Sequence, residues 1–448
     1  MSSPSTTNIP HGASIYKGLV GPLRQRCPLC PAASSQLLLC TGCRAFRYCS
    51  SKHQIAHRPH HKSACIKIKN ARTKLAKEDE AVRNATPDFM TPANAFDTEV
   101  GRFWGILNTR DYMRARMALA RPLLMLGTLE GLREALEHMR DMLRLCRSDN
   151  MGVRYIMPAI MLRLDLDQEC YDFMKWWATC DPDGHYDWGD MTLPYLDIHG
   201  ANALEDPVCF LDPSIELNFG IALLLLKLKM LVDIRNLKVT RKVLAQGRLP
   251  FELRDQIERG VIRSPLTAKL QKEPHGSLIK AEILLQKHIC RTAVAITKAN
   301  EYFMFDLFEP DEALSFQPEP FQRGSWEEMA LAMQNSYAAL WETEGVLSLL
   351  NDARACAARD SENEIEDFME EETARNGQTP VELLADISVN RMWGYLDYAT
   401  DNASYLGPWS ERPSERYTRE NREAWARAMA EDAESDFSDD EAWSDVDE

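Results

Sequence analysis

The sequence predicts a mainly α-helical protein with a small two-zinc module near its N-terminus and a disordered acidic tail. Three observations lead to this fold class. Eight cysteine and histidine residues with metal-ligand spacing lie within the 39 residues from Cys27 to Cys65. Apolar residues recur at helical spacing along most of the chain from Arg110 onward. The last eighteen residues, 431–448, include ten acidic side chains and cannot bury enough apolar surface to become ordered.

The chain is long enough for two or three folded units and has the composition of a folded protein. Of its 448 residues, 45% are hydrophobic and 27% are charged, which are ordinary proportions for a globular protein. The net charge of −16 is unevenly distributed, because residues 1–75 contain twelve Lys and Arg and no Asp or Glu. We therefore expect a basic head in front of a strongly acidic body.

The sequence predicts neither a membrane span nor a secretory signal. The most apolar run, 221–226, is far shorter than the roughly 20 residues of a transmembrane helix. The first ten residues lack the basic and apolar blocks of a signal peptide. Six of the twelve cysteines are clustered in pairs and six are scattered, which favours metal ligands and buried thiols over disulfides. We expect an intracellular protein, nuclear or cytoplasmic, without membrane contact.

The cysteine and histidine cluster has the spacing of zinc ligands. The candidate ligands are Cys27, Cys30, Cys40, Cys43, Cys49, His53, His61 and Cys65. A C-x-x-C pair places two thiolates in one tight turn, and a four-residue step places two side chains on one helix face. Because zinc takes four such ligands, eight ligands predict two ions. The segment is too short for a core of its own, so zinc binding must supply most of its folding free energy.

This pattern resembles the MYND-type zinc finger, in which the first and third ligand pairs share one zinc ion and the second and fourth share the other. The resemblance implies a first site made of Cys27, Cys30, Cys49 and His53. It implies a second site made of Cys40, Cys43, His61 and Cys65. Four supporting residues also match the family: Tyr48, Ser50, Gln54 and Lys62. The family's sixth ligand is normally cysteine, so the imidazole of His53 makes the first site Cys3His.

Two alternatives stay open within this segment. His57 and His60 lie near the ligands and could replace one of the two histidine ligands, although we expect both to be exposed polar residues. A RING finger is cross-braced in a similar way. The short step from Cys43 to Cys49 favours the MYND type.

The MYND resemblance also implies that the finger binds short peptide segments of partner proteins. In the family, proline-rich peptides dock near the residue that corresponds to Gln54. A tryptophan usually follows four residues later, where this chain has Arg58. That replacement favours acidic partner segments that pair with a basic surface. Gln54 and Arg58 are therefore the candidate partner-binding residues.

Composition shifts and turn signals divide the chain into eight stretches. We expect a disordered N-terminus at 1–24, the finger at 25–66 and a basic or mixed-charge linker helix at 67–93. Helical segments follow at 94–245 and 246–358, an acidic linker at 359–376, C-terminal helices at 377–430 and the acidic tail at 431–448.

Helical periodicity predicts the individual helices. The stretch 66–83 is expected to extend the finger's last helix as a solvated rod. Helices of the body are expected at 111–126, 129–146, 151–164, 167–179, 215–244, 277–305, 326–350, 380–400 and 413–429. The first four form two pairs with a unit length in the mid-thirties, as in tetratricopeptide-like repeats, and an irregular helical bundle is the alternative. A long irregular connection with one short strand is expected at 181–213, and Ser325 is expected to cap the helix that follows it.

The sequence contains no motif of a common catalytic class. SET methyltransferase domains accompany some MYND fingers, but the chain has no Gly-rich cofactor loop, P-loop, H-E-x-x-H helix or G-x-S-x-G turn. The chain looks like the fungal MYND proteins that have a helical body and no SET domain. We expect two structural zinc ions and a protein–protein interaction adaptor, not an enzyme. The alternative is a regulator of transcription or chromatin that contacts nucleic acid weakly through the basic N-terminal region.

Overall fold

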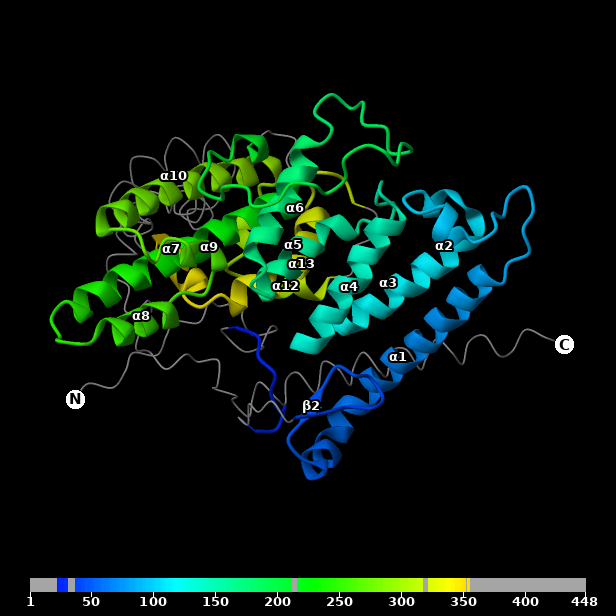
Figure 1. Cartoon of the computed structure of the whole chain (residues 1–448), viewed down its shortest axis with the longest axis horizontal. Coiled ribbons are helices and arrows are strands. Elements are labelled where there is room, and N and C mark those ends of the chain that lie inside the picture. The colour runs from blue at the N-terminus through cyan, green and yellow to red at the C-terminus, as the bar shows by residue number, and fades with distance from the viewer. Residues whose placement is uncertain (1–21, 31–36, 212–215, 317–320, 352, 355–448) are drawn as a thin grey trace, which may run out of the picture. The chain divides into compact units, whose positions relative to one another are not determined.

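The computed structural model describes residues 22–30, 37–211, 216–316, 321–351 and 353–354 (Figure 1). The chain divides into two compact units. The described part of Lys17–Ile160 and Asp183–Asp197 is called the finger unit here, and the described part of Met161–Pro182 and Ile198–Pro413 the body unit. The segments expected at 1–24, 359–376, 377–430 and 431–448 lie outside the described residues, except for the end of the first.

The finger unit begins with a short β-hairpin and continues as helices. Strands β1 (Leu38–Leu39) and β2 (Arg47–Tyr48) pair antiparallel, with Leu38 opposite Tyr48 and Leu39 opposite Arg47. Its longer elements are the helices α1 (Ser51–Arg83), α2 (Ala95–Thr98), α3 (Arg110–Met125) and α4 (Leu129–Leu145). Single 3-10 turns occur at Phe103–Gly105, Leu107–Thr109 and Val153–Tyr155.

Helix α1 starts inside the finger and continues unbroken to Arg83, so it covers only the first part of the stretch 67–93 expected to be a linker helix. Ser50 caps its N-terminus, because the Ser50 hydroxyl accepts a hydrogen bond from the N–H of His53. The expectation of a solvated rod is wrong for one face. Ile68 and Val82 are buried, and α1 packs along α3 (Figure 1). The finger and the helices after it therefore share packed side chains.

Helices α3 and α4 form the antiparallel pair that the sequence predicts. Gly127 adopts a positive φ of 59° in the connection, and the Thr128 hydroxyl caps α4 by accepting from the N–H of Gly131. The buried side chains of α4 recur every three or four residues and form one apolar face: Leu132, Leu136, Met139 and Leu143.

The body unit is helical throughout its described part. Its helices are α6 (Asp167–Thr179), α7 (Leu217–Leu244), α8 (Phe251–Gly260), α9 (Pro265–Ala268), α10 (His275–Ala299), α11 (Phe303–Asp306), α12 (Asp311–Ser315) and α13 (Trp326–Glu342), with a 3-10 turn at Val208–Phe210. Helix α7 is buried on nearly every side and packs against α10 and α13 (Figure 1). Helix α5 (Met157–Arg163) spans the division between the two units.

Several expected helices match the structure and others differ. Helix α6 has the predicted bounds, and Ser325 caps α13 as predicted by accepting from the N–H of Glu328. The stretch expected at 277–305 is divided into α10 and α11, and the polar stretch before it contains α8 and α9. The described part of 181–213 contains no strand.

The two helix pairs do not repeat each other. The starts of α3 at Arg110 and α5 at Met157 are further apart in sequence than a repeat length in the mid-thirties. It has seven residues, whereas α3 has sixteen. A repeat requires similar helices at a constant interval. The described helices therefore fit the irregular bundle.

Two groups of charged side chains in the body core are paired. Lys229 of α7 contacts the carboxylates of Asp165 at 2.6 Å and Asp167 at 2.7 Å. Arg163 and Glu342 form a two-point ion pair of 2.7 and 2.8 Å, and both side chains are buried. Pairing offsets the cost of removing these charges from water. None of the described helices is long and apolar enough to span a bilayer.

Candidate metal centre

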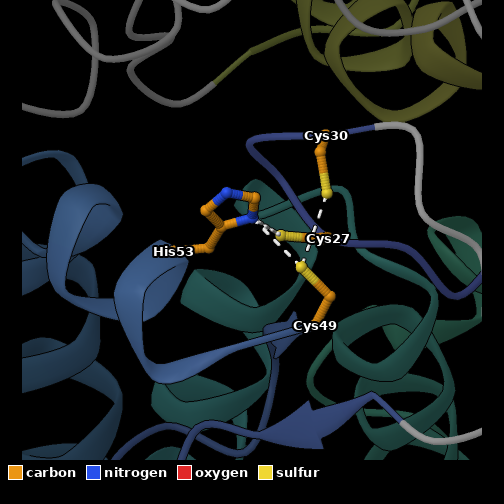
Figure 2. A group of neighbouring side chains, drawn as sticks. All are labelled: Cys27, Cys30, Cys49 and His53. Atoms are coloured by element: carbon orange, nitrogen blue, oxygen red, sulfur yellow. Dashed lines mark hydrogen bonds between the residues drawn. The ribbon is translucent and has the colours of Figure 1, made fainter.

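Four side chains converge at the first predicted zinc site (Figure 2). The Nδ1 atom of His53 lies 3.1 Å from the Sγ of Cys49 and 3.5 Å from the Sγ of Cys27. The Sγ atoms of Cys30 and Cys49 are 3.5 Å apart. Zinc bound at its usual Zn–S and Zn–N distances would separate its ligand atoms by about 3.5–3.8 Å in a tetrahedron. The four donors therefore fit one zinc ion with little movement.

Local structure explains how these donors meet. Cys27 and Cys30 bracket a tight turn, and Cys49 directly follows strand β2. His53 lies in the first turn of α1, where the capping bond from its N–H to Ser50 orients the backbone. Figure 2 shows the imidazole pointing from α1 toward the thiols. The four-residue step from Cys49 to His53 thus brings both side chains to the site, although Cys49 precedes the helix and His53 lies in its first turn.

The second predicted site is more deeply buried. The Nε2 atom of His61 lies 3.3 Å from the Sγ of Cys40 and 3.7 Å from that of Cys43, and the Sγ atoms of Cys40 and Cys65 are 3.9 Å apart. These separations also fit the ligand spacing of a zinc tetrahedron. A Cβ atom at Gly42 would lie 2.6 Å from the Sγ of Cys65. Glycine is therefore required in this turn, because any side chain would displace a ligand.

The second site contains a thiol that ionises readily. Hydrogen bonding from Cys43, together with that from His61, lowers the pKa of Cys65 to about 4. The same contact with Cys65, followed by burial, raises the pKa of Cys43. Zinc binding requires thiolates and releases the remaining thiol protons. Three sulfur donors and one imidazole are ligands that zinc prefers, so the site fits zinc in chemistry as well as in distance.

His57 is not exposed, contrary to the sequence-based expectation, whereas His60 is exposed as expected. The side chain of His57 is 5% exposed and lies outside both ligand sets. Its Nδ1 is 3.0 Å from the hydroxyl of Tyr48, and its ring stacks on His61 with centroids 5.6 Å apart. Burial lowers the pKa of His57 to about 4, so the ring is neutral near pH 7. His57 is a packing residue that supports the ligand His61.

Arg72 and Arg47 connect the zinc finger to α4, and sequence reasoning missed both connections. The Arg72 guanidinium donates to the carbonyl oxygen of Cys43 at 2.7 Å and to Glu134 at 2.7 Å. Arg47 of β2 pairs with Glu130. Burial alone would raise the pKa of Glu134, but the nearby His138 and the hydrogen bonds from Arg72 outweigh it and lower the pKa to about 2. Glu134 is therefore ionised near neutral pH and pairs with Arg72.

The two candidate partner-binding residues lie on α1. Gln54 is half-buried and Arg58 is exposed. Ile55 lies between them in sequence and is 70% exposed, and Leu38 of β1 is 59% exposed. Neither apolar residue was singled out from the sequence, because exposure depends on how the hairpin and helix pack. The outer surface of the finger is thus partly apolar.

The crossed pairing of ligands defines a small structural zinc module with two ions, each held by four protein donors. The expectation of two zinc-binding clusters is confirmed. Residues 27–65 match the family model of the MYND finger, so this part of the chain is a MYND finger, attached to a helical body. No curated protein and no solved structure matches the chain.

Proposed function

We propose that the protein is a zinc-dependent adaptor whose MYND finger recruits a short segment of a partner protein and whose helical body binds a second component. MYND fingers commonly mediate protein–protein interactions. The observation that carries the proposal is that the finger exposes two apolar side chains, Leu38 of β1 and Ile55 of α1, which are available to contact a partner.

The hairpin supports binding of an extended peptide. Strand β1 pairs with β2 on one side and with no other strand of the described residues on the other. A partner segment can add to a free strand edge through main-chain hydrogen bonds, with alternate side chains giving specificity. Apolar side chains of that segment would contact Leu38 and Ile55, and acidic ones would pair with Arg58. The ligand class is thus a short segment with both acidic and apolar residues.

The metal sites support a structural role. Each ion would have four protein ligands, which leaves no position for a reacting water molecule. The ions would fix the hairpin against α1 and so maintain the proposed binding surface. The chemistry of the site therefore favours recognition over catalysis.

Partner capture with the full chain tests this proposal. One variant, Cys40→Ser with Cys43→Ser, removes the second zinc site. A second, Leu38→Ser with Ile55→Ser, changes the exposed surface of the finger and should keep two zinc ions. The matched control is Val208→Ser with Ile283→Ser, which changes two equally exposed apolar residues of the body unit.

The expected result is that the same captured proteins are lost from both finger variants and retained by the control, as measured by mass spectrometry. Each captured protein is then produced in pure form and its binding to the four chains measured. If purified partners bind all four chains equally, the body recruits them and the proposed role of the finger is wrong.

A further inference from the structure

One face of α1 carries a continuous row of exposed apolar and basic side chains. The members recur every three or four residues and thus lie on one side of the helix. We call this row the α1 stripe: Ile55, Arg58, Lys62, Ile66, Lys69, Thr73 and Lys77. Ile66 is 45% exposed. The opposite face of α1, which includes His61 and Ile68, is buried.

The stripe has charge that the described structure does not neutralise. None of its four basic residues forms an ion pair with another described residue. Elsewhere in the described chain, basic side chains such as Arg72 and Arg83 are paired with carboxylates. The chain as a whole is strongly acidic, so this basic face with two exposed isoleucines can attract an acidic segment that also carries apolar side chains.

We propose that residues 431–448 of the same chain bind along the α1 stripe. This segment has ten acidic side chains and two aromatic ones, Phe437 and Trp443. The segment lies outside the described residues, and its composition complements that of the stripe. Acidic side chains would pair with the basic residues of the stripe, and the aromatic rings would cover its isoleucines.

The two sets of residues have compatible dimensions. Ile55 and Ile66 are separated by eleven residues of helix, or about 16 Å along the axis. Phe437 and Trp443 are six residues apart, or about 20 Å in a fully extended chain. A slightly contracted segment therefore places one ring at each isoleucine. The intervening stretch 355–430 can extend to about 250 Å, so chain length does not prevent the contact.

The bound tail would regulate the finger. The stripe begins at Ile55 and Arg58, which also belong to the proposed partner surface. A tail bound there would compete with a partner segment, so removal of the tail would increase partner affinity. This regulatory consequence rests on the proposed adaptor function, whereas tail binding itself does not.

Carbodiimide cross-linking of the zinc-loaded full chain tests tail binding directly. The reagent joins a lysine amine to a carboxylate only when they are in contact. We expect cross-links from residues 431–448 to Lys62, Lys69 and Lys77, at least about fivefold above those to two exposed control lysines, Lys67 on another side of α1 and Lys280 in the body unit. In about 1 M salt the cross-links should largely disappear, because charges are then screened within a few ångströms. Equal labelling of the five lysines, or none, would overturn the proposal.

An equal mixture of unlabelled and ¹⁵N-labelled chains identifies the source of the tail. Cross-links within one isotope class support binding in the same chain. Mixed-isotope cross-links in the expected statistical proportion would show that a second copy supplies the tail and would overturn the proposal as stated. The proposal is also overturned if no tail cross-links form and the stripe lysines become protected from modification only when an acidic protein or a nucleic acid is added.

Two further variants separate tail binding from folding effects. Phe437→Ala with Trp443→Ala keeps every cross-linking group and should reduce the stripe cross-links about fivefold, since one buried apolar side chain commonly contributes that much or more. Ile66→Ser should act similarly, and Ile283→Ser in the body unit should have no effect. Two zinc ions per chain and unchanged helicity verify folding in each case. Partner capture is scored separately, so loss of tail binding leaves the adaptor proposal standing.

Discussion

Arg72 of α1 donates a hydrogen bond to the carbonyl oxygen of Cys43 at 2.7 Å, and so connects a zinc ligand to the helices that follow the finger. The same guanidinium pairs with Glu134 of α4. A single side chain therefore joins the turn that holds the second zinc site to the α3–α4 pair. Zinc binding and the stability of these helices should be coupled within the finger unit.

Substitution of Arg72 tests this coupling. Arg72→Met keeps much of the side-chain volume but leaves Glu134 and the Cys43 carbonyl without their partner. We expect the free energy of unfolding to fall by about 1–3 kcal/mol, and zinc to be lost faster to a chelator. Chemical denaturation and the rate of zinc transfer measure the two effects.

The control for this substitution is Arg83→Met on the same helix. Arg83 forms an exposed pair with Asp79, four residues earlier, and such pairs contribute only about 0.3–0.5 kcal/mol. If Arg72→Met and Arg83→Met release zinc at the same rate, Arg72 does not couple the helices to the metal site.

His53 is expected to be a zinc ligand although the MYND family usually has cysteine at that position. In the full chain, His53→Ala should reduce the zinc content from two ions to one, whereas His53→Cys should retain two, because a thiolate can replace the imidazole. Native mass spectrometry counts the ions. The exposed His60→Ala serves as the control and should keep two. Two ions in His53→Ala would remove this residue from the ligand set.

His57 is expected to affect stability and not zinc content. His57→Ala removes a buried ring that stacks on His61 and is hydrogen-bonded to the Tyr48 hydroxyl, which should lower the free energy of unfolding by about 2–3 kcal/mol. Tyr48→Phe removes only the hydrogen bond and should cost about 1 kcal/mol. Both variants should bind two zinc ions. Loss of one ion from a folded His57→Ala chain would contradict the packing role.

Asp233 is expected to make the free energy of unfolding of the body unit depend on pH. Burial raises its pKa to about 7, although the N–H groups of Arg263 and Ser264 donate to the carboxylate. Because its unfolded pKa is about 4, the folded chain binds more protons between roughly pH 4 and 7. This carboxyl therefore makes the free energy of unfolding fall as pH rises through that window and level off above it.

Asp233→Asn should remove this slope, which is measured by denaturant titrations from pH 4 to 8. Asp206→Asn is the control. A hydrogen bond from Arg291 lowers the pKa of Asp206, so its contribution changes only below the window. If the difference in unfolding free energy between the wild type and Asp233→Asn is constant from pH 4 to 7, the pKa of Asp233 is not raised.

Local signals explain which features could be predicted from sequence. Zinc ligands with fixed short spacings, the cap at Ser325 and the bounds of α6 all depend on neighbours a few residues away. Helix α8 has only ten residues and none of its side chains is buried, and the sequence indicated only a polar stretch there. The burial of His57 depends on Phe46 and Tyr48, which pack against it from the hairpin.

Contacts between distant residues could not be predicted in this way. Arg72 and Glu134 are 62 positions apart, and nothing in either neighbourhood identifies the other. Arg72 was therefore counted only as one positive charge in a basic stretch. The division of the chain within α5 has the same cause, because it depends on which helices pack together rather than on a break in the helical pattern.

The buried pair of Arg163 and Glu342 also affects the order in which parts of the chain can form their contacts during synthesis. The two residues are 179 positions apart, which corresponds to roughly 10–40 seconds of synthesis on a ribosome. During that interval Arg163 has been synthesised but Glu342 has not, so this ion pair cannot form. The described residues of the finger unit end at Asp197, so their synthesis is finished before Glu342 is made. The finger is thus able to take up zinc while the second half of the protein is still being made.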